Sequence, residues 1–89
     1  MKMVMMIHLL ETDEVIYCRA DEYYRTLEPL NYLGIEHTDY IVEDKIYCIT
    51  WYDYIDEDWK DIWCYENEYE EQMNIIREAE VEYEIEEFN

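Results

Sequence analysis

The run IYCITWY at residues 46–52 has the strongest β-strand character in the chain and decides how it folds. β-Branched and aromatic side chains fit the pleated, half-buried surface of a sheet. A strand is therefore expected over residues 45–54. Residues 38–42 have a similar composition, and the polar pair Glu43-Asp44 separates the two stretches. This arrangement predicts a hairpin that turns at Glu43 and Asp44.

The N-terminal region predicts a first hairpin. Residues 3–10 are apolar except for His8, which is typical of a strand covered on both faces. Residues 15–19 are β-branched and aromatic, and a short polar segment separates them from the first strand. The two stretches are therefore expected to pair.

A helix is predicted after this hairpin, with apolar residues at three-residue spacing up to residue 30. Asp21 is expected to cap its start. Pro29 is expected to bend or divide it. Gly34, the only glycine, fits the position just past a helix end.

The C-terminal region predicts two more helices and a last strand. Asp56 is expected to cap a helix whose apolar residues, up to Trp63, follow the i, i+4, i+7, i+8 spacing of one face. Residues 67–80 continue in a helical pattern. Residues 81–88 then alternate glutamate with apolar residues, which indicates a strand with one apolar and one acidic face.

The predicted element order is ββαββααβ. It describes an α+β fold with a small, mostly antiparallel sheet of about five strands packed with two or three helices. We expect a single acidic domain over residues 1–89, with no internal repeat visible. Eleven tyrosines and three tryptophans supply material for a core and argue against disorder.

The charge of the chain is strongly negative. It carries 25 acidic and 6 basic residues, for a net charge of −19. Residues 46–89 hold −13 of this charge and residues 1–45 hold −6. Self-repulsion of this size opposes a compact state, which invites a functional explanation. Nucleic acid and anionic membranes would repel such a protein, and a basic protein surface would attract it. The expected partner is therefore a basic protein.

The cysteines and the N-terminus predict a cytoplasmic location. Cys18, Cys48 and Cys64 are odd in number and form no C-x-x-C pair, which fits reduced thiols. The apolar segment at the start is too short to span a membrane and lacks a cleavage site for export.

No catalytic residue, metal site or cofactor is expected. A thiol nucleophile needs a positive environment, and this chain provides the opposite. No phosphate-binding glycine loop is present. The acidic run at residues 53–61 lacks the glycine of an EF-hand loop, so only weak divalent binding is expected there.

The candidate partner-binding residues are carboxylates together with two tyrosines. Alternate glutamates on the terminal strand would form a row with a spacing of about 6.6–6.8 Å, comparable to the pitch of DNA phosphates. Tyrosines among carboxylates suit an arginine-rich partner. The alternative is that the acids form solvated faces that confer solubility. The predicted partner-binding residues are Asp53, Asp56, Asp58, Asp61, Glu66, Glu68, Glu70, Glu71, Glu82, Glu84, Glu86, Tyr52 and Tyr54.

The chain resembles the small acidic DNA-mimic inhibitors encoded by bacterial viruses, which include anti-CRISPR, anti-restriction and uracil-DNA glycosylase inhibitor proteins. The resemblance rests on the chain length, the acidic runs at residues 53–61 and 66–71, and the alternation of residues 81–88. It is compositional, so it assigns no role to any single residue. It implies binding to the nucleic-acid groove of a host defence or DNA-processing protein, in the cytoplasm of the host cell.

Two other functions stay open. One is an acidic adaptor that blocks a protein interface without mimicking nucleic acid. It would be a homodimer if the terminal strand paired with that of a second copy. The other is a small acidic protein that binds divalent ions.

Overall fold

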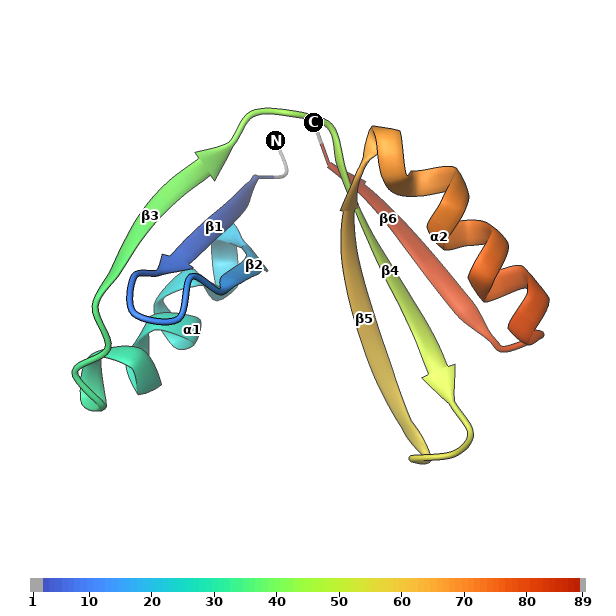
Figure 1. The fold of residues 1–89 in the computed structure, drawn as a ribbon, viewed down its shortest axis with the longest axis horizontal. Helices are drawn as coiled ribbons and strands as arrows, with labels where there is room; N and C mark the ends of the chain where they lie inside the picture. The colour runs from blue at the N-terminus through green and yellow to red at the C-terminus, as the bar shows by residue number, and fades with distance from the viewer. Residues whose placement is uncertain (1–2, 89) are drawn as a thin grey trace. The chain divides into compact units, whose positions relative to one another are not determined.

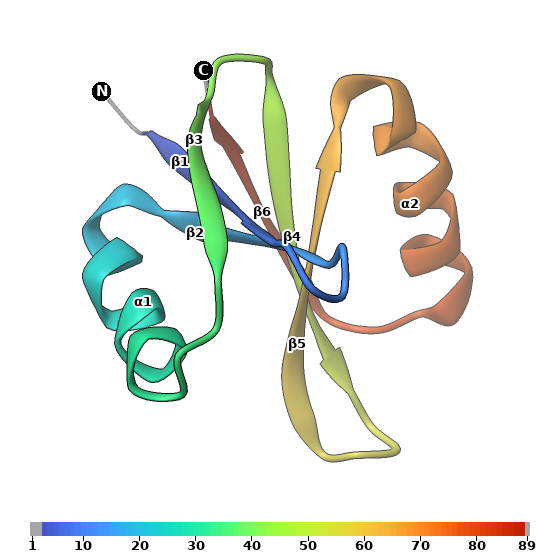
Figure 2. The same cartoon turned by 60° about the vertical axis from the view of Figure 1, so that its left-hand side comes forward.

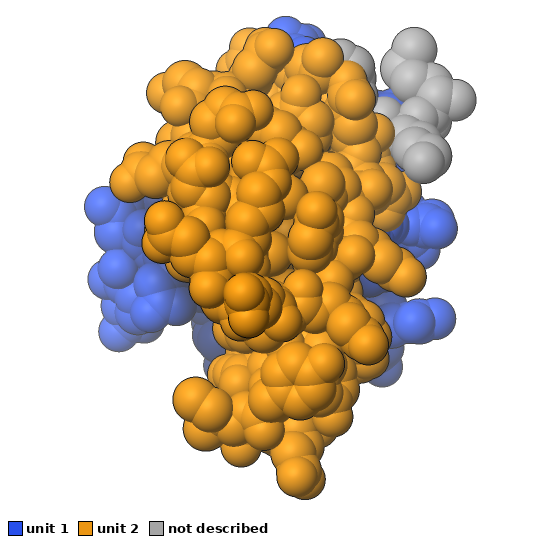
Figure 3. Space-filling model, turned by 90° about the vertical axis from the view of Figure 1, so that its right-hand side faces the viewer, with its two compact units in different colours: residues 1–43 blue, residues 44–89 orange. Residues whose placement is uncertain are grey.

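The computed structural model describes residues 3–88 (Figure 1). Contacts between residues divide the chain into two compact units, residues 1–43 and residues 44–89, which Figure 3 colours separately. The described residues form two antiparallel three-stranded sheets and two α-helices. The predicted α+β class is confirmed. The prediction of one sheet with about five strands is corrected to two sheets with three strands each.

Unit 1 begins with the predicted hairpin. Its elements are β1 (Val4–Leu9), β2 (Val15–Arg19), the 3₁₀ turn η1 (Ala20–Glu22), α1 (Tyr23–Tyr32) and β3 (His37–Val42). The sheet order is β2-β1-β3, so β1 is central and pairs antiparallel with both neighbours. The expectation that residues 3–10 form a central strand paired with residues 15–19 is confirmed.

The core of unit 1 lies between this sheet and α1. Ile7 and Leu9 of β1 alternate along the strand and therefore point to the same face. They are buried together with Cys18 of β2 and with Leu27 and Leu30 of α1. The three-residue spacing of the leucines turns one side of α1 toward the sheet.

The two ends of α1 differ in how well the sequence predicts them. Asp21 does not cap the helix: it lies in η1, and the N-cap residue is Glu22, which makes no side-chain cap bond. Pro29 does not divide the helix: α1 is continuous from Tyr23 to Tyr32 with Pro29 inside it, and the N–H of Leu33 donates to the carbonyl of Pro29 at the end of the helix. Gly34 follows the helix with φ +69°, as expected.

Unit 2 is built around the run IYCITWY. Its elements are β4 (Ile46–Asp53), β5 (Asp58–Tyr65), α2 (Glu66–Ala79) and β6 (Tyr83–Phe88). The sheet order is β5-β4-β6, and β4 pairs antiparallel with both neighbours (Figures 1 and 2). The helix predicted at residues 67–80 and the strand predicted at residues 81–88 are confirmed.

Two sequence predictions for this region are wrong. Residues 38–42 and 45–54 do not form a hairpin, because β3 pairs with β1 whereas β4 pairs with β5 and β6. The helix predicted to start at Asp56 is strand β5. Trp59, Ile62 and Trp63 fit helical spacing, but β5 pairs with β4 along its whole length. Tertiary pairing therefore overrides the local pattern.

Both units share one topology that no sequence repeat reveals. In each, the first strand is central, and the second and third strands flank it in antiparallel orientation. The flanking strands are therefore parallel to each other, and parallel strands need a crossover connection, usually a helix. Helix α1 makes this crossover in unit 1 and α2 makes it in unit 2.

Helix α2 covers one face of its sheet, mainly over β5 and β4. Met73 and Ile76 of the helix are buried against Ile49 of β4 and Cys64 of β5. The other face of the β5-β4-β6 sheet points away from α2. No helix within residues 3–88 combines the length and the apolar character needed to cross a membrane.

Replacing Gly34 with alanine should destabilise unit 1 by about 1 kcal/mol, because a side chain disfavours the left-handed conformation at φ +69°. A Cβ at this position would meet no atom within 4 Å, so the backbone conformation is the main cost. Urea unfolding measures the change. Asn31→Ala is a control in the last turn of the same helix, with an expected change within about 0.5 kcal/mol. If Gly34→Ala were as stable as the parent protein, residue 34 would not have the left-handed conformation described here.

Candidate protein-binding surface

The strand register decides which side chains share a face of the β5-β4-β6 sheet. Residues directly opposite each other on paired strands point to the same face, and alternate residues on one strand point to opposite faces. Ile49 and its partner Ile62 lie on the face that α2 covers. Cys48, Thr50 and Tyr52, together with their cross-strand partners, therefore lie on the face away from α2.

This second face brings acids from two separate strands together. Thr50 lies between Asp61 on β5 and Glu84 on β6. Glu86 pairs with Cys48 one row away. Tyr52 pairs with Trp59 on β5, and its backbone N–H donates to the carbonyl of Glu82 at 2.9 Å. We name these residues the acidic sheet face: Tyr52, Trp59, Asp61, Glu82, Glu84 and Glu86.

The carboxylates of the acidic sheet face consist of a single acid on β5 and a row of glutamates along the strand on the other side of β4. Asp61 lies on β5, two strand spacings or about 9–10 Å from β6. Glu82 and Glu84 follow each other along the row of glutamates at about 6.6–6.8 Å. These three residues are exposed, and within residues 3–88 no basic side chain pairs with any of them. Glu86 is partly buried.

Three aromatic rings lie at the β4–β5 end of this face. The ring of Tyr52 meets those of Tyr54 and Trp59 edge to face, with centroids 4.9 Å and 5.3 Å away. Tyr54 is 58% exposed and Trp59 47% exposed, so the cluster presents ring area to solvent. Exposed rings beside carboxylates suit guanidinium groups, which combine ion pairing with stacking. Trp59 is absent from the predicted partner-binding residues because its spacing predicts the buried side of a helix.

Ion pairs within the turn between β4 and β5, the hairpin tip of unit 2, stabilise this turn. Lys60 Nζ lies 2.8 Å from Asp53 Oδ2 and also pairs with Asp56. Asp53 Oδ1 accepts the N–H groups of Ile55 and Asp56 at 2.9 Å and 3.3 Å. Hydrogen bonding to Lys60 is the main reason why the pKa of Asp53 lies below its usual value. Asp53 and Asp56 therefore have a structural role in the turn, and Asp58 accepts the N–H of Trp59 at 2.8 Å.

The remaining predicted acids lie on a different surface. Glu66, Glu68, Glu70 and Glu71 are exposed on α2. Because α2 covers the opposite face of the sheet, these acids point away from the acidic sheet face. One flat partner surface therefore cannot contact both sets. Glu66 and Glu68 also lie in the first turn, where negative charge stabilises a helix.

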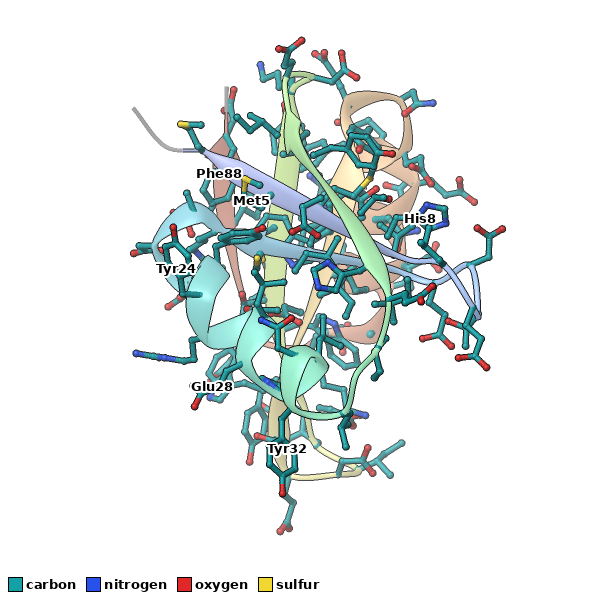
Figure 4. All side chains as sticks on the ribbon, turned by 90° about the vertical axis from the view of Figure 1, so that its left-hand side faces the viewer. Met5, His8, Tyr24, Glu28, Tyr32 and Phe88 are labelled. Carbon is teal, nitrogen blue, oxygen red and sulfur yellow. The ribbon has the colours of Figure 1, made fainter. Side chains whose placement is uncertain are left out.

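Helix α1 presents two tyrosines to solvent. The three-residue spacing of Tyr24, Leu27 and Leu30 predicts one shared face, and this prediction is wrong for Tyr24, because the two leucines are buried and Tyr24 is exposed. Tyr24, Glu28 and Tyr32 follow each other along the outer side of α1 (Figure 4). Tyr24 is 83% exposed and Tyr32 is 89% exposed. The i, i+4, i+8 spacing of these three residues in the sequence places them on one side of a helix. It indicates the solvent-facing side only once Leu27 and Leu30 are known to face the sheet.

A polar cluster in unit 1 joins α1 to β3. The hydroxyl of Tyr23 donates to Asp39, and Nδ1 of His37 lies 2.7 Å from Oδ1 of the same carboxylate. The hydrogen bond to Asp39 is the main cause that raises the pKa of Tyr23 to about 12. The cluster fixes the edge strand β3 against the helix.

The environment of the buried thiols and the grouping of potential metal ligands bear on the chemistry open to this chain. Cys18 and Cys64 are buried, and desolvation raises the pKa of both thiols, so neither is poised as a nucleophile. In the part of the chain that the structure describes, no three His, Cys, Asp or Glu side chains converge to hold a metal ion. No protein-family model, curated protein or solved structure matches this chain.

The ion pair at the hairpin tip predicts a pH dependence. Asp53→Asn keeps an oxygen for the turn but loses the charge that pairs with Lys60. The folded pKa of Asp53 lies below its unfolded value of about 3.9, so the charge stabilises the protein above that pH. This contribution is lost as the pH falls through the folded pKa. We expect the parent protein to melt at a higher temperature than Asp53→Asn at about pH 6, and this difference to shrink as the pH falls below about 3.9.

The control for this prediction is Asp53→Ala, which also removes the oxygen that accepts the N–H groups of Ile55 and Asp56. It should stay less stable than the parent protein at every pH. A difference between the parent and Asp53→Asn that does not change with pH would contradict the role given to the charge.

Proposed function

We propose that this protein inhibits a basic, nucleic-acid-binding protein by occupying its binding surface with the acidic sheet face. The observation that carries the proposal is the pairing of Thr50 with Asp61 on one side and Glu84 on the other. This register gathers on one face exposed carboxylates from separate strands, and neither Asp61 nor Glu84 has a basic partner among residues 3–88. Because Asp61 lies on one side of β4 and Glu84 on the other, the face offers negative charge over an area, as a nucleic-acid backbone does.

The mechanism is steric and electrostatic competition. The net charge of −13 over residues 46–89 would steer the protein toward a basic surface and speed its association. Asp61, Glu82 and Glu84 would replace phosphates, and the rings at the hairpin end would stack on arginine side chains. Neither a cofactor nor a catalytic residue takes part in this mechanism.

The partner class follows from the same chemistry. Surfaces that bind nucleic acid carry clustered lysine and arginine. The proposal therefore places the protein with the virus-encoded inhibitors that block host defence or DNA-processing proteins in the cytoplasm of the host cell. Compositional resemblance and the acidic sheet face are its two supports.

An affinity pull-down at low salt, from the lysate of a bacterial host, tests this proposal. It is repeated with excess double-stranded DNA as competitor, and captured proteins are identified by mass spectrometry. We expect a nucleic-acid-binding protein that DNA displaces. A captured partner that DNA does not displace would contradict mimicry and would favour an adaptor that docks elsewhere.

A charge-neutralising set on the acidic sheet face should weaken binding to this partner by at least about tenfold. The set is Asp61→Asn, Glu82→Gln and Glu84→Gln. All three side chains are exposed and form no ion pair among the described residues, so the fold should be retained. Equilibrium binding at fixed salt measures the loss.

The matched control places the same charge change on α2, with Glu68→Gln, Glu71→Gln and Glu78→Gln. Each set changes the net charge from −19 to −16. The helix set should lower the affinity much less, because these side chains lie on the other side of unit 2. Equal losses from both sets would mean that only the total charge matters and would contradict a specific face.

A further inference from the structure

Strand β6 has an open edge. Within residues 3–88 it pairs only with β4, on one side. The N–H of Tyr52 donates to the carbonyl of Glu82, and backbone groups alternate in direction along an antiparallel strand. The N–H and C=O groups of Glu84 and Glu86 therefore point toward β4. Those of Tyr83 and Ile85 point to the open edge.

The side chains along this edge differ between the two faces of the sheet. Tyr83 and Ile85 lie on the face that carries α2, since they pair with Trp51 and Ile49. They nevertheless remain 42% and 41% exposed, because α2 packs mainly over β5 and β4. The opposite face carries Glu84. Over residues 82–85 the edge is thus apolar on one side and acidic on the other, whereas Glu87 lies on the α2 face and Phe88 is buried on the opposite face.

The edge lacks most of the features that protect sheet edges from pairing. Such features are prolines, lysines, bulges and very short strands. Strand β6 spans six residues without proline or lysine, and its register with β4 is continuous. Its glutamates disfavour a second copy of the chain, because like charges on adjacent strands destabilise a sheet. The negative charge of β6 therefore favours pairing with a strand that carries positively charged side chains.

We propose that β6 pairs with an extended segment of the partner in which lysine or arginine alternates with apolar residues. The segment adds antiparallel to β6 as a fourth strand of the β5-β4-β6 sheet. Its cationic side chains lie beside Glu82 and Glu84, and its apolar side chains lie beside Tyr83 and Ile85. Backbone hydrogen bonds supply affinity and the alternation supplies specificity. The inference rests on the proposed function and specifies the structure of the partner's segment.

The geometry predicts which backbone amides of the added strand are used. In an antiparallel pair, a residue that directs its N–H toward its partner strand lies opposite a residue that does the same. The apolar residues of the segment lie opposite Tyr83 and Ile85, so their amides face β6. The amides of the cationic residues point away to solvent.

The test uses a fluorescein-labelled synthetic peptide of seven residues that alternates lysine and valine. Fluorescence anisotropy at low salt measures its binding to the full-length protein. A second peptide carries N-methyl groups on every valine amide, and a third carries them on the internal lysine amides. A fourth peptide has the same composition, with all lysines grouped together.

We expect the unmodified and lysine-methylated peptides to bind comparably. The valine-methylated peptide should bind at least about tenfold more weakly, because two or more backbone hydrogen bonds are lost. The grouped peptide should also bind more weakly. On the protein, amide exchange at Tyr83 and Ile85 should slow when the alternating peptide is bound.

Three results would overturn the inference or the strand orientation that it specifies. Equal binding of all four peptides would mean that charge alone attracts them, and no binding of the alternating peptide would exclude strand addition to β6. Sensitivity to lysine methylation in place of valine methylation would overturn the antiparallel arrangement. None of these results affects displacement of the partner by DNA, so failure of the inference is distinguishable from failure of the proposed function.

Discussion

The structure of unit 2 depends on the pairing of β4 with a strand on each side. Every residue on β4 has two cross-strand neighbours between residues 46 and 51, and these neighbours share its face. A shift of one residue in either ladder would turn that strand's side chains to the opposite face. The acids now exposed would then lie against α2, and Ile62 or Ile85 would leave the helix-covered face. Burial of Ile49, Cys64 and Met73 therefore fixes both the fold and the position of the acids.

The sequence predicts the elements whose signal is local. The hairpin of β1 and β2, the glycine after α1, helix α2 and the alternation of β6 all follow from patterns within one segment. Strand β5 is different, because Trp59, Ile62 and Trp63 satisfy helical spacing as well as strand pairing. Whether these residues form a strand or a helix depends on pairing with β4, and a spacing pattern within residues 55–63 contains no information about that pairing.

The candidate site was predictable to a similar extent. Alternation along the last strand places Glu84 and Glu86 on one face without any structure. The addition of Asp61 and Trp59 to that face requires the β4–β5 register, which no local pattern provides. The ion pair of Asp53 with Lys60 could not be predicted either, because the sequence does not show which acid in the run at residues 53–61 pairs with this lysine.

The two units have the same topology but differ in the acids that their terminal strands carry. They share a topology, and each uses a helix to cover one face of a three-stranded sheet. The terminal strand of unit 1, β3, carries the single acid Asp39, and this acid is engaged with Tyr23 and His37. The terminal strand of unit 2 instead presents Glu84 without a partner among the described residues. The acidic face is thus a property of the surface residues of unit 2 rather than of its topology.

Carboxylate footprinting of the complex measures whether the acidic sheet face contacts the partner. Carbodiimide coupling labels accessible carboxylates, and mass spectrometry reads the labelling of each residue with and without the partner. We expect Asp61, Glu82 and Glu84 to lose reactivity in the complex, whereas Glu68 and Glu71 on α2 stay reactive. Protection of the α2 carboxylates, with Asp61, Glu82 and Glu84 still labelled, would contradict contact between the acidic sheet face and the partner.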